Sequence, residues 1–199
     1  MTLLDTRLGV AATWRALTAS TGVHVDADLA VSRLGPPLRL EMAEWFPAER
    51  IEEAVGIYRA LYPDHAITPS VALPGALAAL AAVRRVPAQI VVISSKLGRL
   101  VELHLAHLGI EVDQVYGDVF HAGKAEVLRD IGAALYVGDH VADMQAGVLA
   151  GIPVVGVTSG PCSAEELEAA GATVVFPDLY PFPAFLQGMI SVGSAVSGD

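Results

Sequence analysis

Two carboxylates four residues apart form the most chemically suggestive spacing in this sequence. Asp139 and Asp143 lie in ALYVGDHVADMQAG, residues 133–146, where an apolar run ends at Gly138. A hard cation such as Mg2+ binds one or two carboxylates and keeps several water molecules, so this pair suits it. The alternative is that both are acids of a first helical turn, where the helix dipole favours them. Gly138 favours the metal site, because glycine permits a close backbone approach where the carboxylate is presented.

Two further segments could bind an anion. ISSK, residues 93–96, follows the apolar run QIVVI, and the hydroxyl and amide of Ser94 could bind an oxyanion beside a helix N-terminus. Ser95 could share that role or be only a helix N-cap, which is a common role of serine. Lys124 opens a helix in HAGKAEVL, the unfavourable end of the dipole for a cation. Its position suggests an anionic ligand or a carboxylate partner, and a solvated surface lysine is the alternative.

Other polar residues are weaker candidates. His140 could contact a substrate, and Arg33 and Arg39, which flank GPPL, could reach its leaving group, although exposed arginines are commoner. His104 and His107 lie three residues apart on one expected helix. No cysteine or carboxylate pair nearby completes a zinc site, so we expect both histidines at the surface.

The elements that must position these residues follow from the hydrophobic pattern. From about residue 71 onward, short apolar runs alternate with helical stretches, which predicts an α/β fold with a parallel sheet. Such a sheet binds ligands at the carboxyl ends of its strands, where the three segments should meet. Residues 8–69 show only helical stripes, including one that should end before Pro63. The expected parts are a core of residues 1–7 and 70–191, a helical insertion of residues 8–69 and a flexible tail of residues 192–199.

Composition excludes several classes of protein. A net charge of −10 and a pI of about 4.9 argue against nonspecific binding to nucleic acid, which needs basic residues to neutralise phosphates. The longest apolar stretch is broken by Pro74 and Gly75 and is shorter than the ~20 residues of a membrane span. The first residues lack a signal-peptide pattern, and the single cysteine, Cys162, permits no internal disulfide. We therefore expect a cytoplasmic protein; no motif indicates an oligomeric state.

The order of these segments resembles the last three motifs of the haloacid dehalogenase-like hydrolases. A strand followed by Ser-Ser-Lys, a lysine that opens a helix, and Gly-Asp-x-x-x-Asp occur here in that order. The similarity is greatest to the phosphoglycolate-phosphatase-like branch, in which the helical insertion corresponds to a small cap on a Rossmann-like core. The further segments with counterparts in that branch are LLDTRLGVAATWRAL, GPPL, LPGALAAL, HLGIEV and a late GAT-VV run.

The resemblance implies a first motif of the form Asp-x-Asp-Gly-Thr-Leu-x-Asp after the first strand. Its first Asp attacks the phosphoryl group, and its second acts as general acid and base. Residues 2–6, TLLDT, match the tail of this motif, with Met1 in place of its glycine. Both catalytic carboxylates and their strand would then lie upstream of Met1. We expect a gap between the strands of residues 89–93 and 134–138, no turnover by this chain alone, and Met1 to be an internal methionine.

The resemblance further implies a Mg2+-dependent phosphatase that hydrolyses a small phosphorylated metabolite through an aspartyl-phosphate. Ser94 and Ser95 would bind phosphoryl oxygens, and Lys124 would contact the same charge and the nucleophile. Asp139 would bind the metal, with Asp143 supporting it. A cation, a lysine and N–H donors together stabilise the charge of a transferring phosphoryl group. The alternatives are a noncatalytic binding or regulatory relative that has lost the nucleophile, and a phosphomutase.

Overall fold

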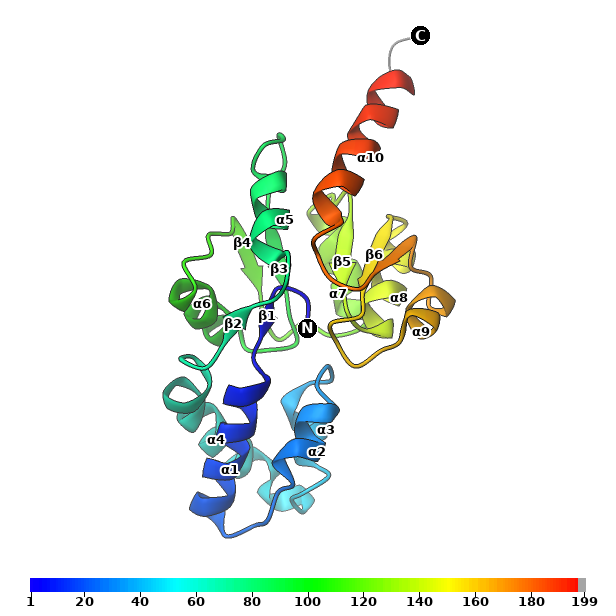
Figure 1. Cartoon of the computed structure of the whole chain (residues 1–199). Helices are drawn as coiled ribbons and strands as arrows, with labels where there is room; N and C mark the ends of the chain where they lie inside the picture. The colour runs from blue at the N-terminus through cyan, green and yellow to red at the C-terminus, as the bar shows by residue number, and fades with distance from the viewer. Residues whose placement is uncertain (197–199) are drawn as a thin grey trace.

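Strands and helices alternate through the second part of the chain, as the sequence predicts. A computed structural model describes residues 1–196 and confirms the α/β fold. All the paired strands of this part are parallel to one another, and Figure 1 shows helices packed around them. The elements are β3 (Val91–Ile93), α6 (Gly98–His107), β4 (Gln114–Tyr116), α7 (Ala122–Asp130), β5 (Tyr136–Gly138), α8 (Val141–Ala150), β6 (Val154–Val157), α9 (Ala164–Ala169) and β7 (Val174–Phe176).

These strands fall into two separate sheets. β3 pairs with β4, and β5, β6 and β7 form the other sheet, but no strand pairing joins β3 to β5 within residues 1–196. A cavity of about 970 Å³ opens between the two sheets, and residues of both β3 and β5 line it. Figure 1 shows the N-terminus between the two sheets. The expected gap is therefore present, and it leaves one edge of each strand unpaired.

Two apolar helices pack against each other at the opposite end of the sheets from the insertion. They are α5 (Ala76–Val83) and α10 (Phe182–Val196), which Figure 1 shows rising side by side. Helix α10 continues to Val196, so it includes residues 192–196 of the expected tail. Phe185 anchors this helix by an edge-on contact with Phe176, with ring centroids 5.7 Å apart, and helix propagation from an anchored turn is favourable. Residues 197–199 lie outside the described residues.

A helical segment is inserted between two short strands that pair antiparallel, β1 (Leu4–Asp5) and β2 (Val71–Ala72). We call its residues 7–66 the cap. Figure 1 shows the cap on the side of the sheets away from α5 and α10. Its helices are α1 (Arg7–Thr21), α2 (Ala27–Ser32), α3 (Leu38–Met42), a 3-10 helix (Ala48–Arg50) and α4 (Ile51–Ala66).

The hydrophobic core of the cap extends to Leu100 of α6. Helix α4 runs through Pro63, contrary to the expectation that it ends before this residue. Tyr62 and Ala66 flank the proline and are 2% and 0% exposed. Their burial offsets the hydrogen bond that a proline removes from a helix. Ala66 also lies against Gly9 of α1, where an added Cβ would stand 2.4 Å from the Ala66 carbonyl oxygen. The ends of the cap are therefore held tightly together beside the core.

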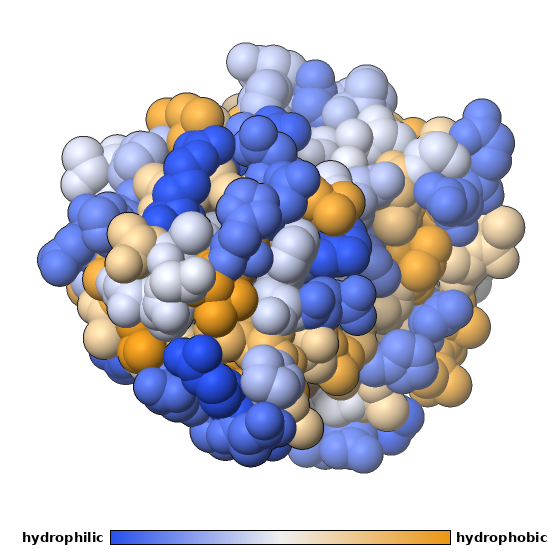
Figure 2. Space-filling model, turned by 90° about the horizontal axis from the view of Figure 1, so that it is seen from below, coloured by the Kyte–Doolittle hydropathy of each residue, from blue (hydrophilic) through white to orange (hydrophobic). Residues whose placement is uncertain are grey.

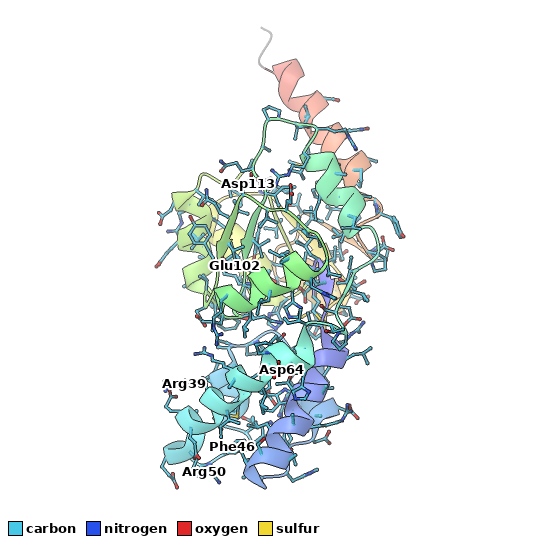
Figure 3. All side chains as sticks on the ribbon, turned by 90° about the vertical axis from the view of Figure 1, so that its left-hand side faces the viewer. Arg39, Phe46, Arg50, Asp64, Glu102 and Asp113 are labelled. Atoms are coloured by element: carbon cyan, nitrogen blue, oxygen red, sulfur yellow. The ribbon has the colours of Figure 1, made fainter. Side chains whose placement is uncertain are left out.

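The outer face of the cap is largely polar. Figure 2, which views the molecule from the cap end, shows hydrophilic side chains over most of this face with apolar ones scattered among them. Figure 3 shows Arg39 at the surface of the cap and Phe46, which is 4% exposed, among its helices. None of the described helices has the length and apolarity needed to cross a membrane.

Candidate active site

Lys124 and Asp143 form a buried ion pair at the carboxyl end of β5. Lys124 lies in the first turn of α7 and Asp143 in that of α8, and Nζ is 2.6 Å from Oδ1. Their side chains are only 10% and 8% exposed. The Tyr136 hydroxyl donates a second hydrogen bond to the same oxygen, at 3.2 Å, and burial and the Asp143 charge hold the Tyr136 pKa well above its usual value. Lys124 is thus not a solvated surface lysine, and a carboxylate explains its unfavourable helix position.

Gly138 allows this arrangement because Asp143 folds directly over it. A Cβ on Gly138 would stand 2.3 Å from the Asp143 Cβ, closer than real Cβ contacts allow. The predicted close approach at the end of the strand is therefore observed, and it involves the second carboxylate of the pair.

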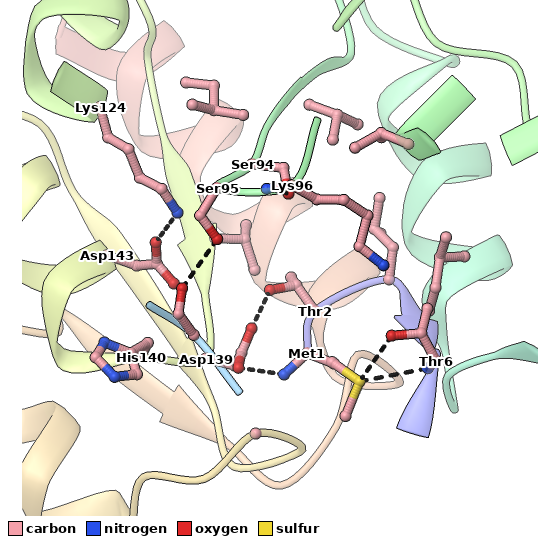
Figure 4. A pocket seen from close by; sticks show the side chains of 18 of the residues that line it. Met1, Thr2, Thr6, Ser94, Ser95, Lys96, Lys124, Asp139, His140 and Asp143 are labelled. Carbon is pink, nitrogen blue, oxygen red and sulfur yellow. Dashed lines mark hydrogen bonds and ion pairs between the residues drawn. The ribbon is translucent and has the colours of Figure 1, made fainter. Parts of the chain in front are cut away.

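Asp139 points into the cavity and already contacts a cation. Its carboxylate forms an ion pair with the Met1 amino group and accepts a hydrogen bond from the Thr2 hydroxyl at 2.8 Å. Figure 4 shows both contacts beside the ion pair of Lys124 and Asp143. The side chain of Asp139 is 16% exposed, so its charge is reachable from the cavity.

The serines after β3 have different partners from those expected. The Ser94 N–H donates to the Tyr116 carbonyl at 2.9 Å, so this amide belongs to the sheet and is not free for an oxyanion. The Ser94 hydroxyl accepts a hydrogen bond from the Lys96 N–H and lines the cavity. The Ser95 hydroxyl donates to the Gly35 carbonyl of the cap at 2.9 Å. Ser95 is also not the N-cap of α6, because that position belongs to Leu97.

One cavity collects most of the predicted site residues. It runs along the gap between β3 and β5, and its end at the carboxyl ends of these strands lies beneath the cap. His140 also reaches it: this residue caps α8, its Nδ1 accepts the Ala142 N–H at 3.1 Å, and its ring lies against Gly35. The predicted site residues that line the cavity are Arg33, Ser94, Ser95, Lys124, Asp139, His140 and Asp143.

The two arginines of the cap have different surroundings. Arg33 pairs with Glu41 at 2.6 Å and lies over the Trp45 ring, 5.5 Å from its centroid, while still lining the cavity. Arg39 pairs with Glu52 on the outer surface, and their side chains are 64% and 67% exposed. Arg39 does not line the cavity and is not brought to the site.

Sequence reasoning missed a polar cluster between the cap and the core. His104, which we expected at the surface, is 1% exposed and lies within hydrogen-bonding distance of Tyr62 and Ser70. Burial and the neighbouring Lys96 lower the pKa of His104 to about 3, so it is neutral. The signal was available: His104 lies four residues after Leu100, on the apolar stripe of its helix.

The carboxylates fit a metal only in part. No group of three or more His, Cys, Asp or Glu side chains within residues 1–196 could hold a metal ion. Asp139 already contacts an ammonium group, whereas the charge of Asp143 is balanced by Lys124. Mg2+ usually takes one or two protein carboxylates and completes its shell with water or phosphate oxygens. Asp139 fits that role, with Asp143 behind it.

The comparisons with known proteins agree with this fold. The sequence profile of the haloacid dehalogenase-like hydrolases matches residues 1–147. This chain therefore belongs to the haloacid dehalogenase-like hydrolase family. No curated protein matches the chain.

Solved structures share the fold at low sequence identity. A haloacid dehalogenase-like family protein from Streptococcus pneumoniae superposes with a TM-score of 0.81 at 20% identity, over 93% of each chain. A hydrolase from Pseudomonas syringae superposes with a TM-score of 0.75 at 21% identity, over 94% of each chain. An inferred phosphoglycolate phosphatase from Lactobacillus delbrueckii gives a TM-score of 0.76 at 17% identity, over 91% of this chain and 92% of that one.

Proposed function

We propose that this hydrolase is a phosphatase that cleaves small phosphorylated metabolites. The observation that carries the proposal is the Lys124–Asp143 pair, which holds a buried cation beside the cavity that Ser94 and Asp139 also line. A phosphoryl group in transfer is strongly anionic, and a fixed cation in a water-poor site stabilises it. The phosphoglycolate-phosphatase assignment of one structural relative, and the phosphate and sodium bound by another from Deinococcus radiodurans, support this class of substrate.

The main residues of the site then have defined roles. Lys124 neutralises phosphoryl oxygens. The Asp143 Oδ1 holds the Lys124 ammonium group, and the Tyr136 hydroxyl donates to the same oxygen and keeps it in place. The Ser94 hydroxyl donates to another phosphoryl oxygen. Asp139 would hold Mg2+, which when bound supplies a Lewis acid for the phosphoryl oxygens. The cap closes the cavity over the rest of the fold; the sequence predicts these two parts as residues 8–69 and as a core of residues 1–7 and 70–191.

The nucleophile is the part that this chain does not supply. Asp5 turns away from the cavity into an exposed ion pair with Arg7, and Asp143 is held by Lys124. We propose that a strand carrying Asp-x-Asp, directly upstream of Met1, fills the gap between β3 and β5. Its first carboxylate would attack phosphorus and form an aspartyl-phosphate while the second protonates the leaving alcohol, and water would then release phosphate. The chain without that strand should be inactive.

The test compares this chain with a form extended upstream to include the Asp pair. In-frame codons before Met1 should encode an apolar strand that ends in Asp-x-Asp. We expect phosphate release from a panel of phosphorylated metabolites by the extended protein with Mg2+, and none by residues 1–199 alone. No hydrolysis of any panel member by a folded extended protein would overturn the proposal. Transfer of phosphate between two positions of a sugar, without release, would indicate the phosphomutase instead.

One observation favours a second candidate, a noncatalytic binding or regulatory protein. One carboxylate of the expected metal site, Asp143, already has a cationic partner in Lys124. A carboxylate that is paired in this way needs no metal to balance its charge. A stop codon, or unrelated residues without an Asp pair, directly upstream of Met1 would favour this second candidate.

A further inference from the structure

The two lysines of the chain have opposite surroundings. The sequence contains only Lys96 and Lys124. Lys124 is paired with the Asp143 carboxylate. The Lys96 ammonium has no carboxylate partner among the described residues: it contacts the Tyr62 hydroxyl and lies 3.4 Å from the His104 Nε2. A charged Lys96 is therefore held only by uncharged groups.

The hydrogen bonds around Lys96 have one consistent direction. The Ser70 hydroxyl donates to the Ile67 carbonyl at 2.5 Å, so it accepts from His104 Nδ1–H, 2.9 Å away. That assignment makes His104 Nε2 an acceptor, which takes the Tyr62 hydroxyl proton at 3.0 Å. Tyr62 in turn accepts from Lys96. The chain of donors ends at a backbone carbonyl and includes no acid that could stabilise an ammonium ion.

Burial allows a substantial fraction of the Lys96 amine to be uncharged near neutral pH. Tyr62 and His104 are 2% and 1% exposed, and the Lys96 Nζ lies 4.7 Å from the Tyr62 ring centroid. Desolvation lowers the pKa of Lys96 to about 7. Asp118 donates its N–H to the Lys96 carbonyl but directs its carboxylate to Arg59, 3.3 Å away. Lys96 nevertheless lines the cavity, so a ligand can reach it.

We propose that Lys96 is a reactive amine that binds small aldehydes in the cavity as an imine, a property that goes beyond the phosphatase reaction. The neutral amine nitrogen would attack the carbonyl carbon, and a proton moves from nitrogen to oxygen to give a carbinolamine. The carbinolamine then loses water to form the imine. Tyr62 is placed to carry the proton, because its hydroxyl touches the amine and burial keeps its pKa above the usual value. Desolvated lysines beside uncharged partners are the ones that form such imines.

The chain itself provides the controls for a labelling experiment. The full chain is incubated with pyridoxal or pyridoxal 5′-phosphate and sodium cyanoborohydride from pH 6 to 9, then digested and mapped by mass spectrometry. Only three amines can react: the Met1 amino group, Lys96 and Lys124. We expect Lys96 to be labelled with a midpoint near pH 7 and in clear preference to Lys124, whose ammonium group is held in the ion pair with Asp143.

Two variants test whether the label is on Lys96 and whether the Tyr62 hydroxyl assists the reaction. Lys96→Met should abolish this label and leave the labelling of Met1 and Lys124 unchanged. Tyr62→Phe keeps the ring and removes the hydroxyl, so imine formation should slow about tenfold or more while the label stays on Lys96. Circular dichroism establishes that each variant is folded. Equal labelling of Lys96 and Lys124 in the wild-type protein, or labelling of Lys96 only above pH 9, would overturn the inference.

The two aldehydes separate this inference from the proposed function. Pyridoxal 5′-phosphate should label Lys96 at lower concentration than pyridoxal if the cavity binds phosphate, an expectation that rests on the proposed function. Equal labelling of Lys96 by both reagents would leave the reactive amine established and count against the phosphate site. Preferential labelling of Lys124 by the phosphorylated reagent would support the phosphate site and contradict the reactive Lys96.

Discussion

Asp143 lies directly over Gly138, so closely that a methyl group on the glycine would be 2.3 Å from the Asp143 Cβ. Gly138→Ala should therefore push Asp143 away from Lys124 and lower the free energy of unfolding by about 1 to 3 kcal/mol. The matched control is Gly56→Ala in α4, where no atom lies within 4 Å of an added Cβ. That change should raise stability by about 0.5 to 1 kcal/mol. Urea denaturation of the two variants checks both signs, and equal effects would contradict this packing.

The ion pair of Lys124 and Asp143 should behave as a buried pair. Lys124→Met leaves an uncompensated carboxylate and should cost about 3 to 5 kcal/mol of unfolding free energy. Replacing both residues with apolar ones should cost clearly less than the sum of the single changes. A double-mutant cycle measured by urea denaturation gives this coupling. Additive single effects would show that the two charges do not interact.

His104 should make the protein sensitive to acid. Its folded pKa of about 3 is below the unfolded value of about 6.5, so the unfolded chain binds a proton first as the pH falls. Its contribution to stability is complete above pH 6.5 and is lost between pH 6.5 and 3, at no more than about 1.4 kcal/mol per pH unit. The difference in unfolding free energy between wild type and His104→Gln should narrow over this range. His107→Gln, at an exposed site on the same helix, should leave the profile unchanged.

The two arginines of the cap should differ in their effect on stability. Arg39→Ala removes an exposed ion pair with Glu52 and should change the unfolding free energy by less than about 0.5 kcal/mol. Arg33→Ala removes a contact with Glu41 and the Trp45 ring, and should lower the melting temperature more than Arg39→Ala does. Thermal unfolding followed by tryptophan fluorescence compares them directly. A larger effect from Arg39 would contradict the surface placement.

Substitutions of Asp139 and Asp143 should differ in how much phosphatase activity they remove. The protein tested is the form extended upstream to include Asp-x-Asp. Asp139→Asn removes a charge that faces the cavity, so phosphatase activity should fall by orders of magnitude and the Mg2+ requirement should rise. Asp143→Asn loosens Lys124 and should cost on the order of 10- to 100-fold. Phosphate release is measured against Mg2+ concentration at fixed substrate. Unchanged Mg2+ dependence in Asp139→Asn would remove this residue from the metal site.

Local patterns in the sequence determined whether each element is a helix or a strand, and they placed the candidate site residues at the carboxyl ends of the strands. Apolar runs and helical stripes are properties of neighbouring residues, so they predicted the α/β core and the helical insertion. The position of Asp139 after a strand predicted a carboxylate at the carboxyl edge of the sheet. Gly138 predicted a close approach, and the motif order predicted the gap between β3 and β5 that the structure contains.

Only the tertiary structure decided which side chains meet, because contacts between distant segments depend on how helices dock against strands. Because α7 packs beside α8, Lys124 meets Asp143. The Ser94 N–H is bonded to the Tyr116 carbonyl of the neighbouring strand. The burial of Tyr62 carries α4 through Pro63 and places its hydroxyl beside Lys96, which no local spacing reveals. Burial also removes water from that amine, so its chemistry depends on surroundings that are assembled only when the cap and the core fold together.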